Sequence, residues 1–367
     1  MKILKIEAIP FNIPFKATAH FRLPGKVSKF CDHVLVKIHT DEGIVGMAEA
    51  PPRPRLYGET QKSIVAAIEE KLTPSLIGLN PFDLEKIHHQ MDYLKQNLAA
   101  KAAIDIALHD VMGQKIGLPI YRFLGGWNEG KVPVAWMMGL KKPEEMAQEA
   151  AGFYRDGIKT FKIKAGMDPQ QDVINFRAIR EAVGNEATLY IDANQWYQPV
   201  DAIRAIRGME PYGIAWAEEP VPITAGERRL RVAQSISVPI SGDESCFTPS
   251  MVAREIAAGV IGLVVIKVAR TGFYQSRKIV HLCEQAGIPC LLGSQGDTGI
   301  GTIAAVHMAK AFKQIKYPIE NTYFLRLEDD LLKEPVRLKD GFIEISEKPG
   351  LGVEIDEEKL KRYRVQL

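Results

Sequence analysis

The sequence predicts an α/β protein whose larger part is a modified TIM barrel, (β/α)7β, preceded by an α+β capping domain. Three observations favour this fold. From about residue 130, short apolar runs alternate with segments of helical spacing; eight such runs recur, roughly 25 residues apart; and the runs end in charged or polar residues. Strands that are apolar on both faces and alternate with helices are typical of a parallel sheet. A doubly wound sheet would typically carry a Gly-rich phosphate turn after its first strand, and none follows "VPVAWMMG".

The barrel elements are predicted from eight strand-like runs, which are "KVPVAWMMG", "IKTFKIKAG", "ATLYIDANQ", "GIAWAEEP", "VPISGDES", "GLVVIKVAR", "IPCLLGSQGD" and "IKYPIENTY". Between them, "DVINFRAIREAVG" and "SMVAREIAAGV" have the apolar spacing of helices, and "SRKIVHLCEQAG" ends on a Gly stop signal.

The two ends of the chain have a different pattern. Residues 1–125 contain a predicted β-hairpin with its turn at 41–43 and then helical stretches, which indicates a separate α+β capping domain. The barrel is predicted over 126–321. The tail, 322–367, contains a strand, a Pro-Gly turn and a short charged helix, and we expect it to return to the capping domain.

Composition excludes several classes of function. The 367 residues are 46% hydrophobic and 25% charged with a net charge of +2, as in an ordinary globular protein, and no basic arm indicates nucleic acid or membrane partners. The N-terminus has no signal or transit pattern, and no apolar span is long enough to cross a bilayer. The four cysteines form no CxxC pair and the eight histidines no zinc motif, so a reduced cytoplasmic protein without zinc is expected.

Polar residues follow the barrel strands at nearly constant intervals. From Lys164 to Lys267 the steps are 28, 26, 25 and 24 residues, one strand–helix unit each. In a closed barrel the carboxyl ends of the strands converge on one mouth, where barrel enzymes place their chemistry. The strand-end residues are Lys162 with Lys164, Asp192, Glu218, Asp243, Lys267, Ser294 to Asp297, and Glu320.

Three of these residues predict a metal site. Asp192, Glu218 and Asp243 come from three consecutive strands and would repel one another in a half-buried site. A hard divalent cation removes that repulsion, and an all-oxygen ligand set suits Mg²⁺ or Mn²⁺.

Three lysines flank the predicted metal. Strand residues two apart face the same way, so Lys162 and Lys164 both point into the mouth, and Lys267 lies beyond the acidic residues. A metal-bound carboxylate substrate can lose its α-proton because the cation stabilises the enediolate. Lys162 and the cation both favour a neutral Lys164, as a general base requires. Lys162 itself is predicted to contact the substrate carboxylate or to tune its neighbour.

These motifs resemble the enolase superfamily and, within it, the muconate-lactonizing subgroup. The resemblance covers nearly the whole chain, and the matching motifs are "KIK" at 162–164, "DANQ" at 192–195, "EEP" at 218–220, "GDES" at 242–245 and "IKVAR" at 266–270. It implies that Asp192, Glu218 and Asp243 hold the metal and that Lys164 and Lys267 are the acid/base lysines. It also implies a small-molecule carboxylate substrate and a homo-oligomer.

Within the subgroup, "VAWMMG" and "LYGET" resemble muconate cycloisomerases. Lys164 would then protonate the enediolate formed by ring closure. Lys267 would stay charged and balance the negative charge of the enediolate from the other face. Two alternatives use the same lysines and metal. One is a racemase or epimerase of N-acyl amino acids or dipeptides, and the other is a dehydratase of acid sugars or hydroxy acids. Dipeptide epimerases carry two aspartates one residue apart after the eighth strand, and "PIENTYF" has none. A non-catalytic barrel is disfavoured by the intact lysines and carboxylates.

Further residues are candidates for substrate contact. In the barrel these are Ser294, Asp297, which lies where cycloisomerases have Glu, and Glu320. "GSQGDTGIG" (293–301) could instead cradle a phosphate, although Asp297 would repel it. The capping domain offers two Gly/Pro-punctuated loops as a lid, with His20, Arg22 and Tyr57 as contacts for a distal carboxylate.

Overall fold

The computed structural model describes the backbone of residues 1–16, 21–23 and 26–367, and the side chains outside 17–28. The capping strands form an antiparallel sheet in the order β1-β4-β5, and the β4–β5 hairpin turns at 41–43, as predicted. The strands are β1 (Ile3–Pro14), β4 (Phe30–Thr40) and β5 (Val45–Ala50), with a separate small hairpin of β2 (Phe21–Leu23) and β3 (Lys26–Ser28).

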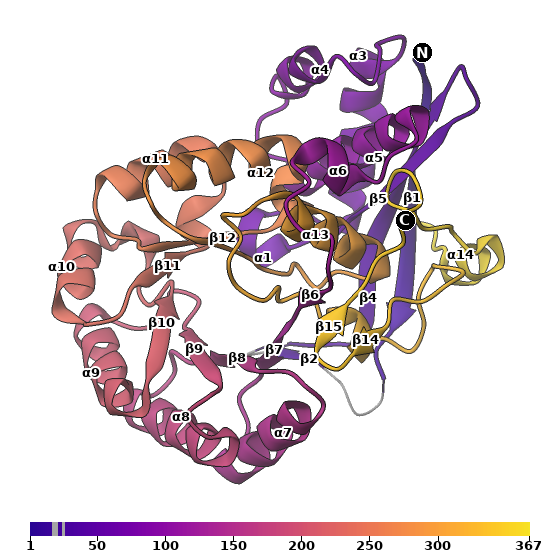
Figure 1. The fold of residues 1–367 in the computed structure, drawn as a ribbon. Helices are drawn as coiled ribbons and strands as arrows, with labels where there is room; N and C mark the ends of the chain where they lie inside the picture. Colours follow the sequence, from indigo (N-terminus) through magenta and orange to yellow (C-terminus); the bar gives the residue numbers. More distant parts are fainter. Residues whose placement is uncertain (17–20, 24–25) are drawn as a thin grey trace.

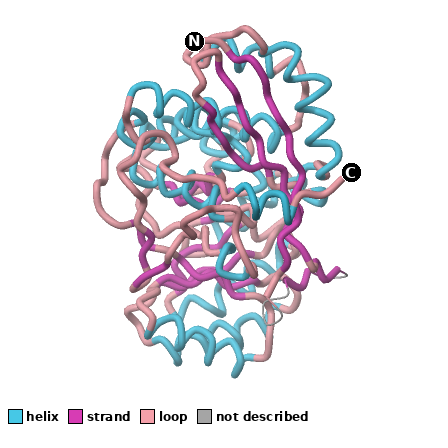
Figure 2. The backbone as a smooth tube through the Cα atoms, turned by 90° about the vertical axis from the view of Figure 1, so that its right-hand side faces the viewer, coloured by secondary structure: helices cyan, strands magenta, loops and turns pink. Residues whose placement is uncertain are grey.

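Helices cover this sheet (Figures 1 and 2). The long α5 packs on β5 and β4 and is buried along most of its length, because it lies between the cap sheet and barrel helix α12. The helices are α1 (Pro54–Tyr57), α2 (Gln61–Ala66), the π-helix η1 (Ala67–Leu72), α3 (Thr73–Leu76), α4 (Leu84–Met91), α5 (Leu98–Ile116) and α6 (Ile120–Leu124).

The barrel contains seven parallel strands in sequential order from β7 to β13. Their residues are buried on both faces, which is the pattern that the apolar runs predict. The strands are β7 (Ala135–Met138), β8 (Thr160–Lys164), β9 (Thr188–Asp192), β10 (Ile214–Glu218), β11 (Ile240–Gly242), β12 (Leu263–Ile266) and β13 (Cys290–Leu292).

The eighth predicted strand is a segment with isolated bridges instead of a regular ladder. Residues 315–320 lie between β13 and β7, and the backbone N–H groups of Glu320 and Ala135 donate to the carbonyls of Leu292 and Ile319, respectively. Pro318 has no N–H to donate and so interrupts the ladder. The barrel is nevertheless closed by hydrogen bonds on both sides of this segment.

The helices α7 to α13 follow the strands. They form the outer layer of the barrel (Figure 1). Four of them begin with Pro in the first turn, where its missing N–H costs nothing. The helices are α7 (Pro143–Arg155), α8 (Pro169–Val183), α9 (Pro199–Met209), α10 (Glu227–Ser235), α11 (Pro249–Ala257), α12 (Val268–Gln285) and α13 (Gly299–Ala311). Four short 3-10 helices, η2 to η5, occupy Glu210–Tyr212, Ile223–Ala225, Glu244–Cys246 and Tyr323–Arg326.

The tail joins both parts of the molecule. Its strands β14 (Leu338–Lys339) and β15 (Phe342–Ile343) form a small sheet with β6 (Val132–Pro133), at the start of the barrel. After α14 (Glu357–Tyr363), Val365 donates its N–H to the carbonyl of Pro10 in β1. The last residues therefore lie along the cap sheet. None of the helices in the described part of the chain combines the length and apolar character that a membrane span requires.

Candidate active site

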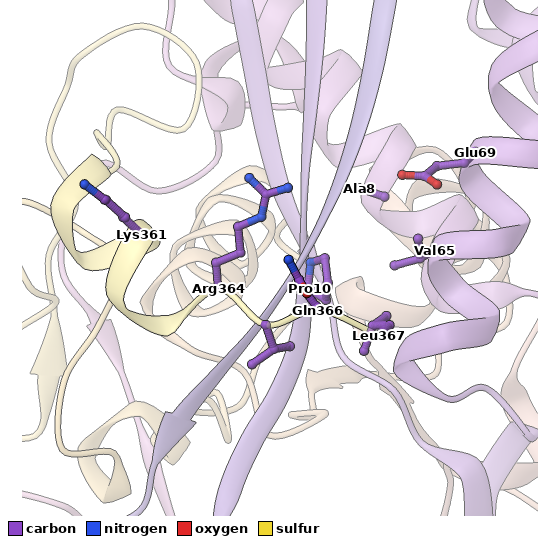
Figure 3. Close-up of a pocket in the computed structure, with 9 residues that line it drawn as sticks. Ala8, Pro10, Val65, Glu69, Lys361, Arg364, Gln366 and Leu367 are labelled. Atoms are coloured by element: carbon purple, nitrogen blue, oxygen red, sulfur yellow. The ribbon is translucent and has the colours of Figure 1, made fainter.

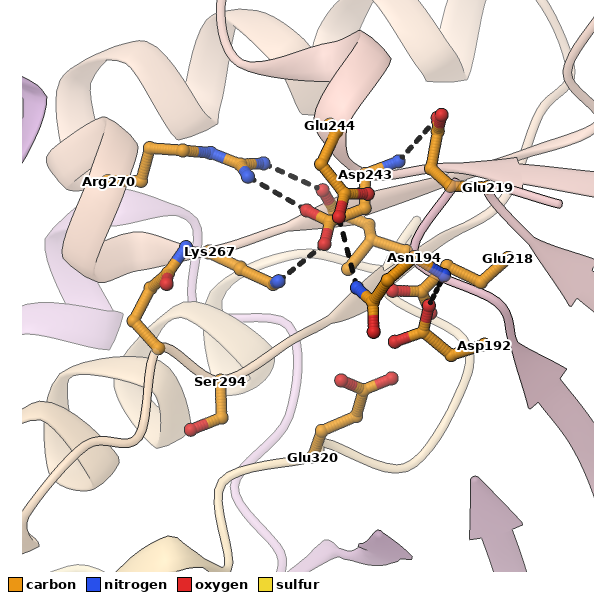
Figure 4. Close-up of polar contacts among 12 residues, drawn as sticks. Asp192, Asn194, Glu218, Glu219, Asp243, Glu244, Lys267, Arg270, Ser294 and Glu320 are labelled. Carbon is orange, nitrogen blue, oxygen red and sulfur yellow. Dashed lines mark hydrogen bonds and ion pairs between the residues drawn. The ribbon is translucent and has the colours of Figure 1, made fainter. Parts of the chain in front are cut away.

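The strand-end residues form one cluster at the carboxyl ends of the barrel strands. Lys164, Asp192 and Glu218 end β8, β9 and β10, and the strand register pairs Lys164 with Asp192 and Asp192 with Glu218. Asp243 directly follows β11, and Lys267 directly follows β12. Figure 4 shows the acidic side chains converging, with Lys267 beside Asp243. The structure therefore brings together five residues that are far apart in the sequence.

Lys162 lies one layer below the mouth and is 2% exposed. Its Nζ donates to both oxygens of Glu218 at 2.7 and 2.8 Å and to both oxygens of Glu320 at 3.1 and 3.0 Å, and lies 3.0 Å from Oδ2 of Asp192. Burial opposes the charged form of Lys162, but the three carboxylates outweigh it and raise its pKa well above the ordinary value. In this structure Lys162 is thus the shared counter-charge of three carboxylates.

Lys164 lies at the mouth and is more exposed than Lys162. Its Nζ donates to Oδ2 of Asp192 at 2.7 Å and to Oδ1 of Asn194 at 2.5 Å. Burial alone would raise the pKa of Asp192, but Lys162 and Lys164 hold it well below its usual range. Asn194 has φ 42°, an uncommon backbone conformation for a residue other than glycine, of the kind that concentrates at functional sites.

Asp243 is held by two cations on the other side of the cluster. Nζ of Lys267 donates to its Oδ2, and Nη1 of Arg270 donates to its Oδ1 at 2.8 Å. Burial favours the neutral acid, yet these two cations lower the pKa of Asp243 to about 2. Arg270 also lies over the ring of Phe247, 4.5 Å from its centroid.

The described residues contain no group of three or more His, Cys, Asp or Glu side chains arranged to hold a metal ion. Ammonium and guanidinium groups instead contact oxygens of all three predicted ligands. The donor chemistry nevertheless fits a hard divalent cation, because the three carboxylates are buried and offer only oxygen. Burial, and then the charge of Asp192, raise the pKa of Glu218 well above its usual range, so the cations present do not compensate every carboxylate.

Two adjacent acids support the predicted ligands. Oε1 of Glu219 accepts the backbone N–H groups of Asp243 and Ser245, so Glu219 orients the turn that carries Asp243. Oε1 of Glu244 accepts from Nδ2 of Asn194 at 3.0 Å, and its Oε2 is buried without a hydrogen-bond partner in the described part of the chain. Glu244 therefore has an uncommitted oxygen beside the cluster, which also fits a cationic ligand.

The loop after β13 is tied down by its own side chains. Asp297 is 2% exposed, and its Oδ2 accepts from Oγ of Ser294 at 2.6 Å, from the N–H of Gln295 at 3.1 Å and from Nδ2 of Asn321 at 2.7 Å. Glu320 is bound by Lys162 and by the hydroxyl of Tyr190 at 2.6 Å. These contacts are internal to the protein, and the predicted substrate contacts of Ser294, Asp297 and Glu320 stay predictions.

The predicted cap contacts are partly described. His20 and the side chain of Arg22 lie outside the described residues. Tyr57 packs edge-on against Phe247, with ring centroids 5.7 Å apart, and Phe247 follows Asp243 by four residues. Helix α1, which ends at Tyr57, therefore lies against the segment that follows β11.

Sequence reasoning did not assign roles to Asn194, Arg270 and Tyr190, which contact the cluster. Asn194 and Arg270 stand inside the quoted motifs "DANQ" and "IKVAR", which was the available signal. Tyr190 lies two residues before Asp192 and so shares its strand face. It stacks on Trp216 within a barrel-interior cluster below the mouth.

A surface pocket of about 650 Å³ occurs elsewhere (Figure 3). It lies between β1, α2, η1 and the C-terminal residues, and its charged lining side chains are Glu69, Lys361 and Arg364. It contains none of the strand-end residues, so the carboxylate cluster remains the candidate active site.

Fold and site together define a barrel enzyme with a capping domain, in which two lysines bracket a set of buried carboxylates. Comparison with known families agrees. Residues 145–359 match the family described as "Enolase C-terminal domain-like", and residues 16–125 match "Mandelate racemase / muconate lactonizing enzyme, N-terminal domain". The chain belongs to the mandelate racemase/muconate lactonizing enzyme family of the enolase superfamily, whose members depend on a divalent metal. It is an isomerase, either a cycloisomerase or a racemase/epimerase.

Individual relatives fall on both sides of that division. The crystal structure of muconate lactonizing enzyme from Mucobacterium Smegmatis complexed with muconolactone has a TM-score of 0.96, 41% identity and full coverage of both chains. The N-succinyl-L-Arg/Lys racemase of Bacillus cereus is 34% identical over 90% of each chain. The dipeptide epimerase from Enterococcus faecalis, complexed with Mg and L-Leu-L-Tyr, has a TM-score of 0.91 and 36% identity, covering 96% of this chain and 99% of its own.

Proposed function

We propose that this protein is a Mg²⁺- or Mn²⁺-dependent cycloisomerase that acts on an unsaturated dicarboxylate of the muconate type through an enediolate. The observation that carries the proposal is the placement of two lysines about the carboxylates. Lys164 ends β8 and Lys267 follows β12, and the three carboxylate-bearing strands lie between them in the barrel. The likeness to a muconate lactonizing enzyme over the whole chain supports the ring-closing version of this chemistry.

Asp192, Glu218 and Asp243 would hold the divalent cation. When bound, the cation supplies the positive charge that stabilises an enediolate. Lys164 is the more exposed of the lysines and is positioned to exchange a proton with the carbon next to the substrate carboxylate. Lys267 lies across the site and stays charged, so it balances negative charge from the other face.

The remaining residues orient these groups. Asn194 and Asp192 fix the Lys164 ammonium, and Arg270 holds Asp243 from the helix that follows Lys267. Lys162 keeps Glu218 and Glu320 in place below the substrate. The buried position of these groups excludes water and strengthens each charge interaction.

A racemase or epimerase of N-acyl amino acids is the second candidate. The same pair of lysines favours it, since one can remove the α-proton and the other return it to the opposite face. The relatives named as N-succinyl amino acid racemase and dipeptide epimerase support it.

The test incubates the Mg²⁺-loaded protein in D₂O with cis,cis-muconate and, separately, with N-succinyl amino acids. Lactone formation is followed by ultraviolet absorbance, inversion by polarimetry, and deuterium at the α-carbon by NMR. We expect lactone that carries solvent deuterium, and loss of turnover by at least about 100-fold in Lys164→Ala. Lys159→Ala, which changes an exposed lysine just before the same strand, is the matched control. Inversion without lactone would replace the first candidate by the second, and full turnover in Lys164→Ala would contradict both.

A further inference from the structure

A buried carboxylate of the capping domain binds the backbone of a barrel helix. Asp105 lies in α5, which packs directly against α12, and its side chain is fully buried. Its Oδ2 accepts the backbone N–H groups of Phe273 and Tyr274 in α12, at 2.5 and 3.2 Å. One carboxylate oxygen of the capping domain therefore holds two successive N–H groups of the barrel.

These two N–H groups are the first of a second helical segment within α12. Gly272 has φ 60° and ψ −173°, which is not helical, so it separates a turn at 268–271 from a helix at 273–285. The first N–H groups of a helix have no partner inside it, and a carboxylate there also interacts favourably with the helix dipole. Asp105 is thus the N-terminal cap of helix 273–285, supplied by a different domain.

The turn that precedes this helix follows a lysine of the active site. The carbonyl of Lys267 accepts the N–H groups of Arg270 and Thr271 at 2.8 and 3.1 Å. The hydroxyls of Thr271 and Ser276 lie 2.6 Å apart, so the turn is also bonded to helix 273–285. Because Phe273 follows Lys267 by only six residues, a displacement at the start of the helix is passed to Lys267 through this turn.

Two histidines of the capping domain hold Asp105 in turn. Nε2 of His88 lies 2.7 Å from Oδ1 of Asp105, and Nδ1 of His109 lies 3.5 Å from its Oδ2. The ring of His88 also stacks on Tyr274, with the ring centroids 4.0 Å apart. Burial alone would raise the pKa of Asp105, but His109 and His88 hold it below its usual range. The carboxylate is therefore ionised, and both of its oxygens are fixed.

We infer that Asp105 is a positioning residue for Lys267, so that the capping domain fixes the place of an active-site lysine of the barrel through the start of helix 273–285. The contacts of Asp105 are to the backbone of α12 and to histidines, so it acts on the site through that helix. The inference rests on the proposed function for the role of Lys267, but it holds for either candidate reaction. A misplacement of about 1 Å in an active site can cost about 100-fold in rate.

The experiment compares two buried carboxylates of the same helix. Asp105→Ala removes the cap of helix 273–285, and Asp105→Asn retains the volume and one acceptor oxygen. Asp110→Ala is the matched control, because Asp110 is 2% exposed and accepts the N–H groups of Leu351 and Met47 at 2.8 and 2.9 Å, outside α12. The full-length Mg²⁺-loaded proteins are assayed for kcat and KM with cis,cis-muconate and with N-succinyl amino acids. Hydrogen–deuterium exchange at the amides of Arg270 and Thr271 is measured by mass spectrometry.

We expect kcat to fall by about 10- to 100-fold in Asp105→Ala, with KM changed by less than about threefold, because Lys267 acts on the transition state. The amides of Arg270 and Thr271 should exchange at least about tenfold faster, because the turn is no longer anchored. Asp105→Asn should lie between the wild-type protein and Asp105→Ala in both measurements. Asp110→Ala should lose stability in urea unfolding but keep kcat within about twofold and leave the exchange of these amides unchanged.

Wild-type kcat and exchange in Asp105→Ala, or an equal loss of kcat in Asp110→Ala, would overturn the inference. If Asp105→Ala does not fold, Asp105→Asn decides, since faster exchange at Arg270 and Thr271 supports the inference and wild-type exchange overturns it. Absence of wild-type turnover with both kinds of acid would instead refute the proposed function, because amide exchange is measured without substrate.

Discussion

Replacing Lys162 by Met removes the one ammonium that three buried carboxylates share. Met retains a side chain of similar length, so the cavity contribution is small. The Nζ of Lys162 has four contacts of 2.7 to 3.1 Å with Glu218 and Glu320, and both acids are at most 5% exposed. Removing one partner of a buried ion pair typically costs about 3–5 kcal/mol. We expect a loss of that size in the free energy of unfolding, a large share of the total for a domain.

The assay is unfolding in urea, monitored by circular dichroism. The midpoints of the variants are compared, provided that the slope of the free energy of unfolding against urea concentration is the same. Lys62→Met, which changes an exposed lysine, is the control and should cost less than about 0.5 kcal/mol. Adding Glu320→Gln to Lys162→Met should restore at least about 1 kcal/mol, because one unpaired charge is removed. A loss below about 1 kcal/mol in Lys162→Met, or no recovery in the double variant, would refute the view that Lys162 is the shared counter-charge.

Three further predictions concern a buried histidine, a buried glycine and removal of the metal. Burial lowers the pKa of His307 to about 4, and its Nε2 and Nδ1 bond the carbonyl of Leu351 and the N–H of Tyr121. The unfolded chain binds a proton on this histidine more readily than the folded protein does. The contribution of neutral His307 to the free energy of unfolding is therefore fully present above pH 6.5, and about 3 kcal/mol of it is lost as the pH drops to 4. The His307→Gln variant should show a weaker dependence of the unfolding free energy on pH. Gly272→Ala should destabilise the protein by more than about 2 kcal/mol in thermal unfolding, because φ is 60° and the new Cβ would lie 2.4 Å from a carboxylate oxygen of Asp105. Gly287→Ala is the control, because its surroundings are open and the substitution adds only the backbone strain. EDTA should abolish turnover and Mg²⁺ or Mn²⁺ restore it, and turnover indifferent to chelation would contradict a metal-dependent reaction.

The barrel and its mouth could be predicted because both follow from periodicity. Apolar runs at one strand–helix spacing predict parallel strands, and the residue that ends each run must then lie at the common mouth. The same rule predicts from the sequence that Lys164, Asp192, Glu218, Asp243 and Lys267 lie together. The eighth apolar run also predicts a strand, but Pro318 leaves this segment with only isolated bridges.

Depth within the barrel could not be predicted in the same way. Lys162 and Lys164 share a strand face, yet two residues differ in height by about 6.6 Å, enough to place one among the buried carboxylates and the other at the mouth. Likewise the sequence cannot distinguish an aspartate that faces substrate from one that closes a loop, and Asp297 bonds its own loop.

The sequence by itself determined the fold class, the family and the identity of the strand-end groups, because strand and helix periods and residue spacing are local properties of the chain. Only the tertiary structure decided which cation neutralises which carboxylate and which cap residue lies at the barrel mouth. Those pairings depend on depth in the barrel and on the docking of two distant segments, and electrostatic energies in a buried site change steeply over a few ångströms.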